Sequence, residues 1–249
     1  MRGLGQFAVI SDVHGNVWAL DAVLADIARR GIEGIVNLGD HVFGPLDPVG
    51  AANRLIKLAC PTIRGNMDRE IFDNSPAVPG STLEQNRQAL KFHHRAWLAS
   101  LPPTLLYDGD ILLCHGTPGS DCTYLLETVS PTGATLASIE EIETRSDGRA
   151  ESLIVCGHSH LPRTVLLPAG TMVVNPGSVG LPAYTQDEPY PHRMETGSPH
   201  ARYAIIRRSE SGWQVEHIDV VYDWQRAAEV AAQNGREDWA RALVSGRAV

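Results

Sequence analysis

The stretch SLIVCGHSH, residues 152–160, joins a short apolar run to a glycine and two histidines that one serine separates. Such a run before a glycine is typical of a buried strand that ends in a sharp turn. Any polar residue could make that turn, so two histidines are an unusual choice. Their presence at 158 and 160 indicates a binding role, and the residues that follow the other apolar runs test this interpretation.

Five further apolar runs end in polar or glycine-rich turns. They lead into DVHG (12–15), GD (39–40), GNMD (65–68), HG (115–116) and NPGSVG (175–180). In open α/β sheets, ligands bind beyond the carboxyl ends of the strands. We therefore expect the polar side chains of these turns to converge on one place, where the glycines let the backbone turn sharply and approach closely.

Seven of these side chains are of types that bind metal ions: two carboxylates, one amide oxygen and four imidazoles. They are Asp12, His14, Asp40, Asn66, His115, His158 and His160. Each alone has a simpler interpretation as a turn or capping residue, but the whole set at successive strand ends favours metal binding. Seven ligands are too many for one ion and suit two ions that share a bridging carboxylate. Ligation by oxygen and imidazole without thiolate is typical of Mn, Fe, Co, Ni or Zn, among which the sequence does not choose.

The composition excludes several other classes of protein. The 249 residues carry a net charge of −8, which argues against a dedicated basic surface for nucleic acid. A phosphate substrate remains compatible, since bound metal reverses the local charge. The four cysteines form no CxxC pair, the N-terminus lacks a signal-peptide core, and no run approaches the roughly 18 apolar residues of a membrane span. We expect a cytoplasmic protein without a membrane segment, and the sequence leaves oligomerisation open.

The pattern along the chain predicts a single domain, 1–249, of α/β layers with two packed sheets. Capping signals and periodicity predict helices over about 16–31, 47–58 and 81–100, and PTIR (61–64) as a strand between the last two. The second half is richer in strands. Residues 181–200 contain four prolines and are expected to form a long irregular loop, and a helical segment is expected at 223–244.

The ordered motifs resemble those of the calcineurin-like metallophosphoesterases, whose pattern is D-x-H, G-D, G-N-H-D/E, a histidine before glycine, and G-H-x-H. The resemblance covers residues 7 to about 207. GDHVFGPLDP and VNPGSVGLP look like the compact bacterial and archaeal branch, with its small phosphodiesterases and diadenosine-tetraphosphatase-like proteins. The resemblance implies a four-layer αββα sandwich with two mixed sheets and a dinuclear metal site at the carboxyl ends of the strands.

The resemblance also assigns the ligands to two ions. Asp12, His14, Asp40 and His160 would hold the first ion, and Asp40 would bridge to a second ion held by Asn66, His115 and His158. The two histidines of GHSH would therefore serve different ions.

One motif departs from the family pattern, because Met67 stands where the family has a histidine that contacts phosphate and protonates the leaving group. A thioether cannot donate that proton. His41, next to Asp40, is a tentative replacement, with a solvated loop histidine as the alternative interpretation. The resemblance otherwise implies that Asp40 and Asn66 belong to the catalytic site.

The resemblance implies a metal-dependent phosphoesterase, in the first place a phosphodiesterase on small or nucleotide substrates that uses in-line attack by a metal-bridging hydroxide. A phosphomonoesterase or a dinucleoside-polyphosphate hydrolase is an alternative. An alternative of another class is a non-catalytic protein-interaction scaffold of the same fold. The retention of all seven ligand-type residues argues against a scaffold.

Overall fold

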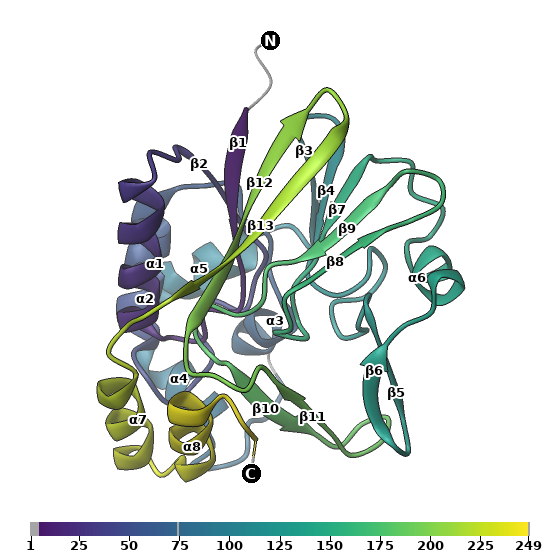
Figure 1. Cartoon of the computed structure of the whole chain (residues 1–249). Coiled ribbons are helices and arrows are strands. Elements are labelled where there is room, and N and C mark those ends of the chain that lie inside the picture. Colours follow the sequence, from purple (N-terminus) through teal and green to yellow (C-terminus); the bar gives the residue numbers. More distant parts are fainter. Residues whose placement is uncertain (1–4, 74, 249) are drawn as a thin grey trace.

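Two β-sheets packed face to face form the centre of the protein in the computed structural model, which describes residues 5–73 and 75–248 (Figure 1). The first sheet has the strand order β13-β12-β1-β2. It is mixed, because β1 pairs parallel with β2 and antiparallel with β12. Its strands are β1 (Gln6–Ile10), β2 (Gly34–Asn37), β12 (Ala201–Ser209) and β13 (Gly212–Val220).

The second sheet has the order β3-β4-β7-β9-β8 and is also mixed. Strands β4, β7 and β9 run parallel, while β3 and β8 pair antiparallel at the two edges. Its strands are β3 (Thr104–Tyr107), β4 (Ile111–Cys114), β7 (Leu153–Val155), β8 (Arg163–Leu166) and β9 (Met172–Asn175).

Alternation along the strands creates the layers, since successive side chains of a strand point to opposite faces. In β1, Phe7 and Val9 pack with Leu113 between the two sheets, whereas Ala8 and Ile10 belong to the apolar cluster on the helical side. Both faces of β1 are therefore buried, which explains why it reads as a continuous apolar run.

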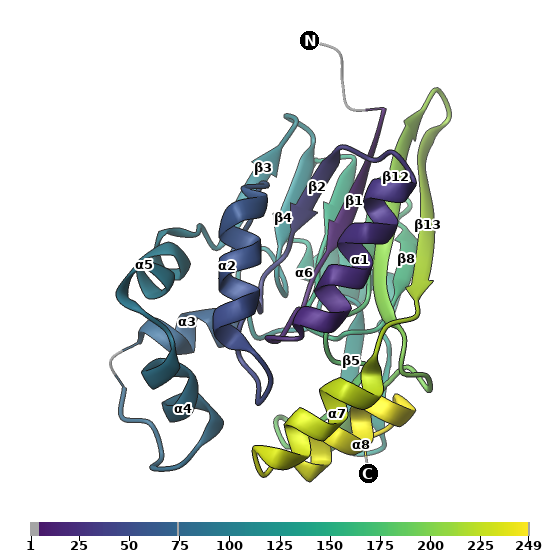
Figure 2. The ribbon, with the colours of Figure 1, turned by 90° about the vertical axis from the view of Figure 1, so that its left-hand side faces the viewer.

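Helices cover the outer faces of both sheets. Figure 2 shows α1 (Val17–Arg29) and α2 (Pro48–Leu58) side by side over the first sheet, and α6 (Ile139–Arg145) lies on the far side of the second. Asn16 and Asp47 cap α1 and α2 by accepting hydrogen bonds from backbone N–H groups in the first turn. The predicted αββα sandwich with two mixed sheets is confirmed.

Residues 181–200 were expected to be irregular, and this prediction is wrong. They contain β10 (Ala183–Gln186) and β11 (His192–Glu195), which pair antiparallel. All four prolines lie outside the two strands, so none of them removes a hydrogen bond between β10 and β11. Their density nevertheless hid the short strands from a reading of the sequence alone.

Two further expectations about elements need correction. The helix expected over 81–100 is two helices, α4 (Thr82–Ala89) and α5 (Phe92–Ser100). The break lies at Leu90, which leaves the helical conformation and is buried in the core beside α5. The strand expected at 61–64 is a single bridge between Asn37 and Thr62.

Two helices close the C-terminal part of the chain, as expected: α7 (Trp224–Gln233) and α8 (Glu237–Ser245). In Figure 1 they lie beside β10, below the first sheet. The remaining elements were not anticipated and are α3 (Asn66–Phe72), β5 (Glu127–Ser130) and β6 (Gly133–Leu136). Within 5–73 and 75–248, no helix combines the length and apolar character that crossing a bilayer requires.

Candidate metal centre

The loops that follow four strands meet at one edge of the two sheets. The backbone N–H of Asp12, after β1, donates to the carbonyl of Gly39, after β2, at 3.0 Å. The N–H of Gly157, after β7, donates to the carbonyl of His115, after β4, at 2.7 Å. These cross-links bring six of the predicted ligands together, and Asn66 joins them from the first residue of α3. Five of the seven line a cavity of about 260 Å³, and the fully buried Asp12 and His115 are absent from its lining.

Five of the seven side chains are held by backbone in the left-handed region. Among the described residues, eight that are not glycine have positive φ, and five of these are Asp12, His14, Asp40, His158 and His160, with φ between 51° and 68°. This conformation costs free energy for residues with a β-carbon and persists only where surrounding contacts impose it. Its concentration in the predicted ligands marks this edge as a functional site.

Two glycines allow the carboxylates to approach neighbouring backbone. A β-carbon at Gly65 would collide with the carboxylate of Asp40, and one at Gly157 would lie 2.9 Å from Asp12 Oδ2. Each carboxylate thus lies directly against a backbone segment from a different strand end. The glycines of GN and GHSH are required by this close approach.

Backbone carbonyls fix the orientation of three imidazoles. The Nδ1 atoms of His14, His115 and His160 lie 2.8, 2.7 and 2.7 Å from carbonyl oxygens, so each Nδ1 carries the proton and donates it. In the neutral rings Nε2 is therefore an unprotonated acceptor turned into the site. Such a carbonyl partner is typical of metal-ligating histidines, because it fixes both the tautomer and the ring orientation.

His158 has the opposite arrangement. Its Nε2 lies 3.1 Å from the carbonyl oxygen of Cys122 and donates to it, which leaves Nδ1 as the ligand atom. Its ring also stacks on Tyr124, with 4.7 Å between the ring centres and 26° between the planes.

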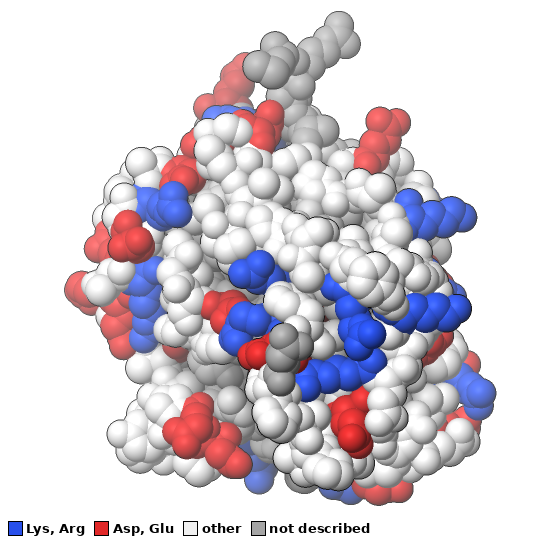
Figure 3. Space-filling view, turned by 180° about the vertical axis from the view of Figure 1, so that it is seen from behind, with Lys and Arg blue, Asp and Glu red and all other residues white. Residues whose placement is uncertain are grey.

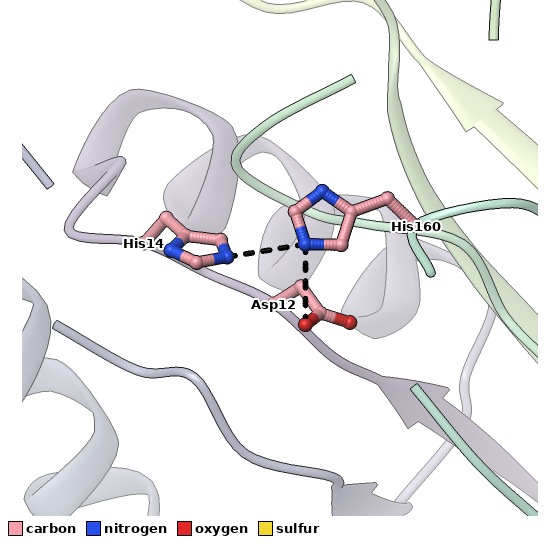
Figure 4. Close-up of side chains that lie close together, drawn as sticks. All are labelled: Asp12, His14 and His160. Carbon is pink, nitrogen blue, oxygen red and sulfur yellow. Dashed lines mark hydrogen bonds and ion pairs between the residues drawn. The ribbon is translucent and has the colours of Figure 1, made fainter. Parts of the chain in front are cut away.

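One group of candidate ligands consists of Asp12, His14 and His160 (Figure 4). The Nε2 atoms of His14 and His160 are 3.2 Å apart, and His160 Nε2 is 3.3 Å from Asp12 Oδ1. Two unprotonated nitrogens cannot bond to each other, and Asp12 Oδ1 has no hydrogen-bond donor. A divalent cation would satisfy all three atoms, so the donor set fits the metal that the sequence implies.

The second group consists of Asp12, Asp40 and His115, next to Asn66. Asn66 Oδ1 lies 3.1 Å from His115 Nε2. Asp40 Oδ2 lies 3.5 Å from His115 Nε2 and 3.8 Å from His14 Nε2, so Asp40 stands between the two groups. By distance, Asp12 is the residue that belongs to both groups. The family resemblance instead makes Asp40 the carboxylate that bridges the two ions, and that assignment stays a prediction.

The buried charges perturb several pKa values. Burial disfavours the imidazolium of His115, but Asp40 and Asp12 outweigh it and raise the pKa of His115 to about 10. Burial, reinforced by His115, lowers the pKa of His158 to about 4. Burial disfavours the carboxylate of Asp40, yet the neighbouring histidines hold its pKa well below the usual value. Metal binding therefore has to displace a proton from His115.

Attraction of an anion has to arise at the site itself. The protein carries a net charge of −8, which repels anions at long range. On the face seen in Figure 3, Lys and Arg side chains are mixed with Asp and Glu, so that face is not uniformly basic. Divalent ions at the carboxylate and imidazole cluster would supply local positive charge.

Asp68 is a positioning residue; the sequence places it at the D/E position of the G-N-H-D/E motif but assigned it no role. Its fully buried carboxylate accepts hydrogen bonds from the N–H groups of Asp40 at 2.8 Å, His41 at 2.9 Å and Gly65 at 3.0 Å. It thereby joins the turn after β2 to the start of α3. Its place two residues after Asn66 was the only signal in the sequence.

His41 does not occupy the place that either interpretation gave it. It is fully buried, its Nδ1 lies 2.7 Å from Asp68 Oδ2, and its ring contacts Trp97. It is therefore not a solvated loop histidine. It also does not line the cavity, in which a leaving group would need its proton donor. Met67 does line the cavity.

The sequence profile of the calcineurin-like phosphoesterase superfamily domain matches residues 6–196, which is most of the chain. The chain belongs to this superfamily. A relative in sequence is an uncharacterized protein of Methanocaldococcus jannaschii, 28% identical over 254 residues, with 93% of this chain and 94% of the relative covered.

Two solved structures share the calcineurin-like fold. A metallophosphoesterase from Sphaerobacter thermophilus superimposes with a TM-score of 0.76 at 24% identity, covering 97% of this chain and 98% of the other. A putative diadenosine tetraphosphatase gives a TM-score of 0.52 at 16% identity, covering 88% and 95%. Both similarities concern the fold.

Proposed function

We propose that this protein is a metal-dependent phosphoester hydrolase that acts on phosphodiesters of small molecules or nucleotides. One observation carries the proposal: four oriented imidazoles, two buried carboxylates and one amide oxygen converge at a cavity, with acceptor atoms facing each other. In this proposal Asp12, His14, Asp40 and His160 hold one divalent ion, and Asp40, Asn66, His115 and His158 hold the other.

Bound divalent ions would polarise the phosphoryl oxygens and lower the pKa of coordinated water from 15.7 to about 7. The chain itself contributes rigidity. The carbonyls of Phe43, Leu38 and Leu181 hold three imidazoles in one tautomer. The N–H of Met67 donates to Asp40 Oδ1 at 2.9 Å and holds that carboxylate in place. Because little has to reorganise, ligand atoms and substrate are positioned before the reaction.

The residues near the proposed leaving group support an ester with a good leaving group as the substrate. Met67 lines the cavity but has no proton to donate, and His41 does not reach it. Without an imidazole at either position, departure of the leaving group depends more strongly on its own stability. A diester with one acidic alcohol or phenol meets this condition better than an alkyl monoester.

The test is hydrolysis of a panel of diesters, monoesters and dinucleoside polyphosphates after loading with Mn, Fe, Co, Ni or Zn. We expect diester turnover that chelation abolishes and that His158→Ala abolishes, while His93→Ala keeps it. His93 is a matched control, because it is an exposed histidine of α5 outside the cavity. Faster hydrolysis of monoesters or dinucleoside polyphosphates would keep the phosphoester hydrolase but replace phosphodiesters as its substrate class. Stoichiometric metal without hydrolysis of any ester would favour the scaffold instead.

A further inference from the structure

The cavity beside the candidate metal centre has one polar end and one aromatic wall. His14, Asp40 and His160 are among the residues at the polar end. The wall includes Phe43, Tyr124 and Tyr184 of β10, and Trp239 of α8, which are half-buried except for the more deeply buried Trp239. Aromatic side chains therefore line the cavity directly next to the place where a phosphoryl group would bind.

Three of these rings each pack against a different candidate ligand. The ring centres of Trp239 and His14 are 5.7 Å apart, and those of Tyr184 and His160 are 4.7 Å apart. Tyr124 stacks on His158. Because the wall contacts the metal-binding histidines themselves, a phosphoester held at the polar end would place its organic group within reach of the rings.

The wall is preformed. Trp239 is only 7% exposed, and the guanidinium of Arg236 lies over its ring at 5.3 Å. Arg236 donates to Asp238 at 2.9 Å and to Thr82 Oγ1 at 2.9 Å, which fixes the start of α8. At the other end of α8, the N–H of Ala248 donates to Glu195 Oε1 of β11 at 2.7 Å.

Helix α8, which contributes Trp239 to the cavity wall, lies outside the part of the chain that matches the family domain. The family match ends at residue 196, whereas α8 spans Glu237–Ser245. The predicted ligands all lie inside the match, and Trp239 lies outside it. The shared domain thus contains the chemistry of the site, and a further segment of this chain shapes what can bind beside it.

We propose that Tyr184 and Phe43, supported from behind by the mostly buried Trp239, form a subsite for a planar aromatic group of the substrate, either a nucleobase or an aryl ring. The proposal rests on the proposed function, since the phosphoryl group of the same molecule occupies the metal centre. A cavity of about 260 Å³ suits a small molecule and is too small for a folded protein surface. Flat rings bind flat rings by stacking. A tenfold gain in affinity from such stacking corresponds to about 1.4 kcal/mol of binding free energy.

The experiment is calorimetric binding of phosphonates, whose P–C bond resists hydrolysis, to the full-length protein loaded with Mn²⁺. Methylphosphonate probes the metal centre alone, phenylphosphonate adds an aryl ring, and the methylene phosphonate analogue of adenosine 5′-monophosphate adds a nucleobase. We expect at least one aromatic ligand to bind at least about fivefold more tightly than methylphosphonate. Which of the two does so distinguishes an aryl from a nucleobase subsite.

Three variants test the wall. Trp239→Ala should bring the ratio of aromatic to methyl affinity close to one, and Trp239→Phe should keep most of it. Ala242→Phe, which places a ring into the cavity from the same helix, should also lower the ratio and decides the matter if Trp239→Ala does not fold. Trp224→Ala is the control, because Trp224 lies on α7 and packs on Tyr222 and His200, away from the cavity.

The proposal is overturned if the wild-type ratio is close to one, or if Ala242→Phe and a folded Trp239→Ala leave it unchanged. Failure of the proposed function looks different: the metal-loaded protein then hydrolyses no ester, or its metal centre binds no phosphonate at all. Adenosine, which has no phosphate, decides that case: binding that Ala242→Phe abolishes supports the subsite, and absence of binding overturns it.

Discussion

The Nε2 atoms of His14 and His160 face each other at 3.2 Å although both rings donate their Nδ1 protons to backbone carbonyls. Two acceptor atoms at this distance repel each other unless a cation or a shared proton lies between them. The two residues come from turns that are 146 positions apart, and each is held in the left-handed backbone region. The fold therefore maintains an arrangement that is unfavourable without a bound cation.

Removal of one of these imidazoles should primarily affect metal binding. His160→Ala should lower metal affinity by at least the roughly 10–100-fold that outer-shell substitutions cost. Turnover should fall to background, while the circular dichroism spectrum stays that of the wild type. Metal content is measured by elemental analysis after gel filtration, with His93→Ala as the control. Full metal content and near-wild-type rates in His160→Ala would refute the assignment of this ligand.

Chelation should abolish activity and leave the protein folded. The core between and around the two sheets is extensive and does not depend on metal, unlike that of a zinc finger. The melting temperature should nevertheless fall, because metal at about 100 times its Kd stabilises the native state by about 2.7 kcal/mol. Thermal unfolding followed by circular dichroism, with and without chelator, measures both effects. Loss of secondary structure at 25 °C would contradict this prediction.

Asp68→Asn should weaken metal binding although it replaces no metal ligand. The amide can accept the N–H of Asp40 or of His41 through its one oxygen, but its NH₂ group would face the remaining donors. We expect about 10–100-fold lower metal affinity and about 1–3 kcal/mol lower unfolding free energy. Titration with Mn²⁺ and urea unfolding measure the two quantities. Asp187→Asn, an exposed aspartate, is the control, and equal effects in both variants would rule out the positioning role.

Met67→His should restore a proton donor at the cavity. Wild-type rates should fall steeply as the pKa of the leaving group rises, since the thioether of Met67 supplies no proton. The substitution should flatten that dependence and accelerate alkyl esters by up to the 10²–10⁴-fold typical of general acid catalysis. The measurement is a series of substituted phenyl and alkyl diesters. An unchanged slope in a variant with normal metal content would show that position 67 does not face the leaving group.

Part of the stability that the protein loses at acid pH should come from Asp26. Burial raises the pKa of this carboxyl, but hydrogen bonds from Tyr203 at 2.6 Å and Arg30 at 2.7 Å outweigh burial and lower it. The contribution is therefore complete above the unfolded pKa of about 3.9 and is lost as pH falls through the lower folded value. Urea unfolding of wild type and Asp26→Asn should differ most at neutral pH, and the difference should shrink below about pH 4. A difference that stays constant down to pH 2 would contradict the assignment.

Several features of the fold follow from local rules that the sequence displays directly. Asn16 and Asp47 cap helices because their short side chains reach the free N–H groups of the first turn. A short continuous apolar run makes β1 a strand that is buried on both faces, and the short runs after residue 104 form strands at the predicted places. The break at Leu90 was not predicted, because no local residue forbids a helix there and only burial against α5 ends it.

The amino-acid sequence by itself determined the identity of the seven candidate ligands, because each lies in a turn after an apolar run and such turns converge at one edge of the sheets. Only the tertiary structure decided how they are oriented, since the carbonyls of Phe43, Leu38 and Leu181 come from other parts of the chain. It also buried His41 against Asp68 and brought Trp239 from α8 to the wall of the cavity. Such contacts join residues that are far apart in the chain, and neither periodicity nor a local motif records them.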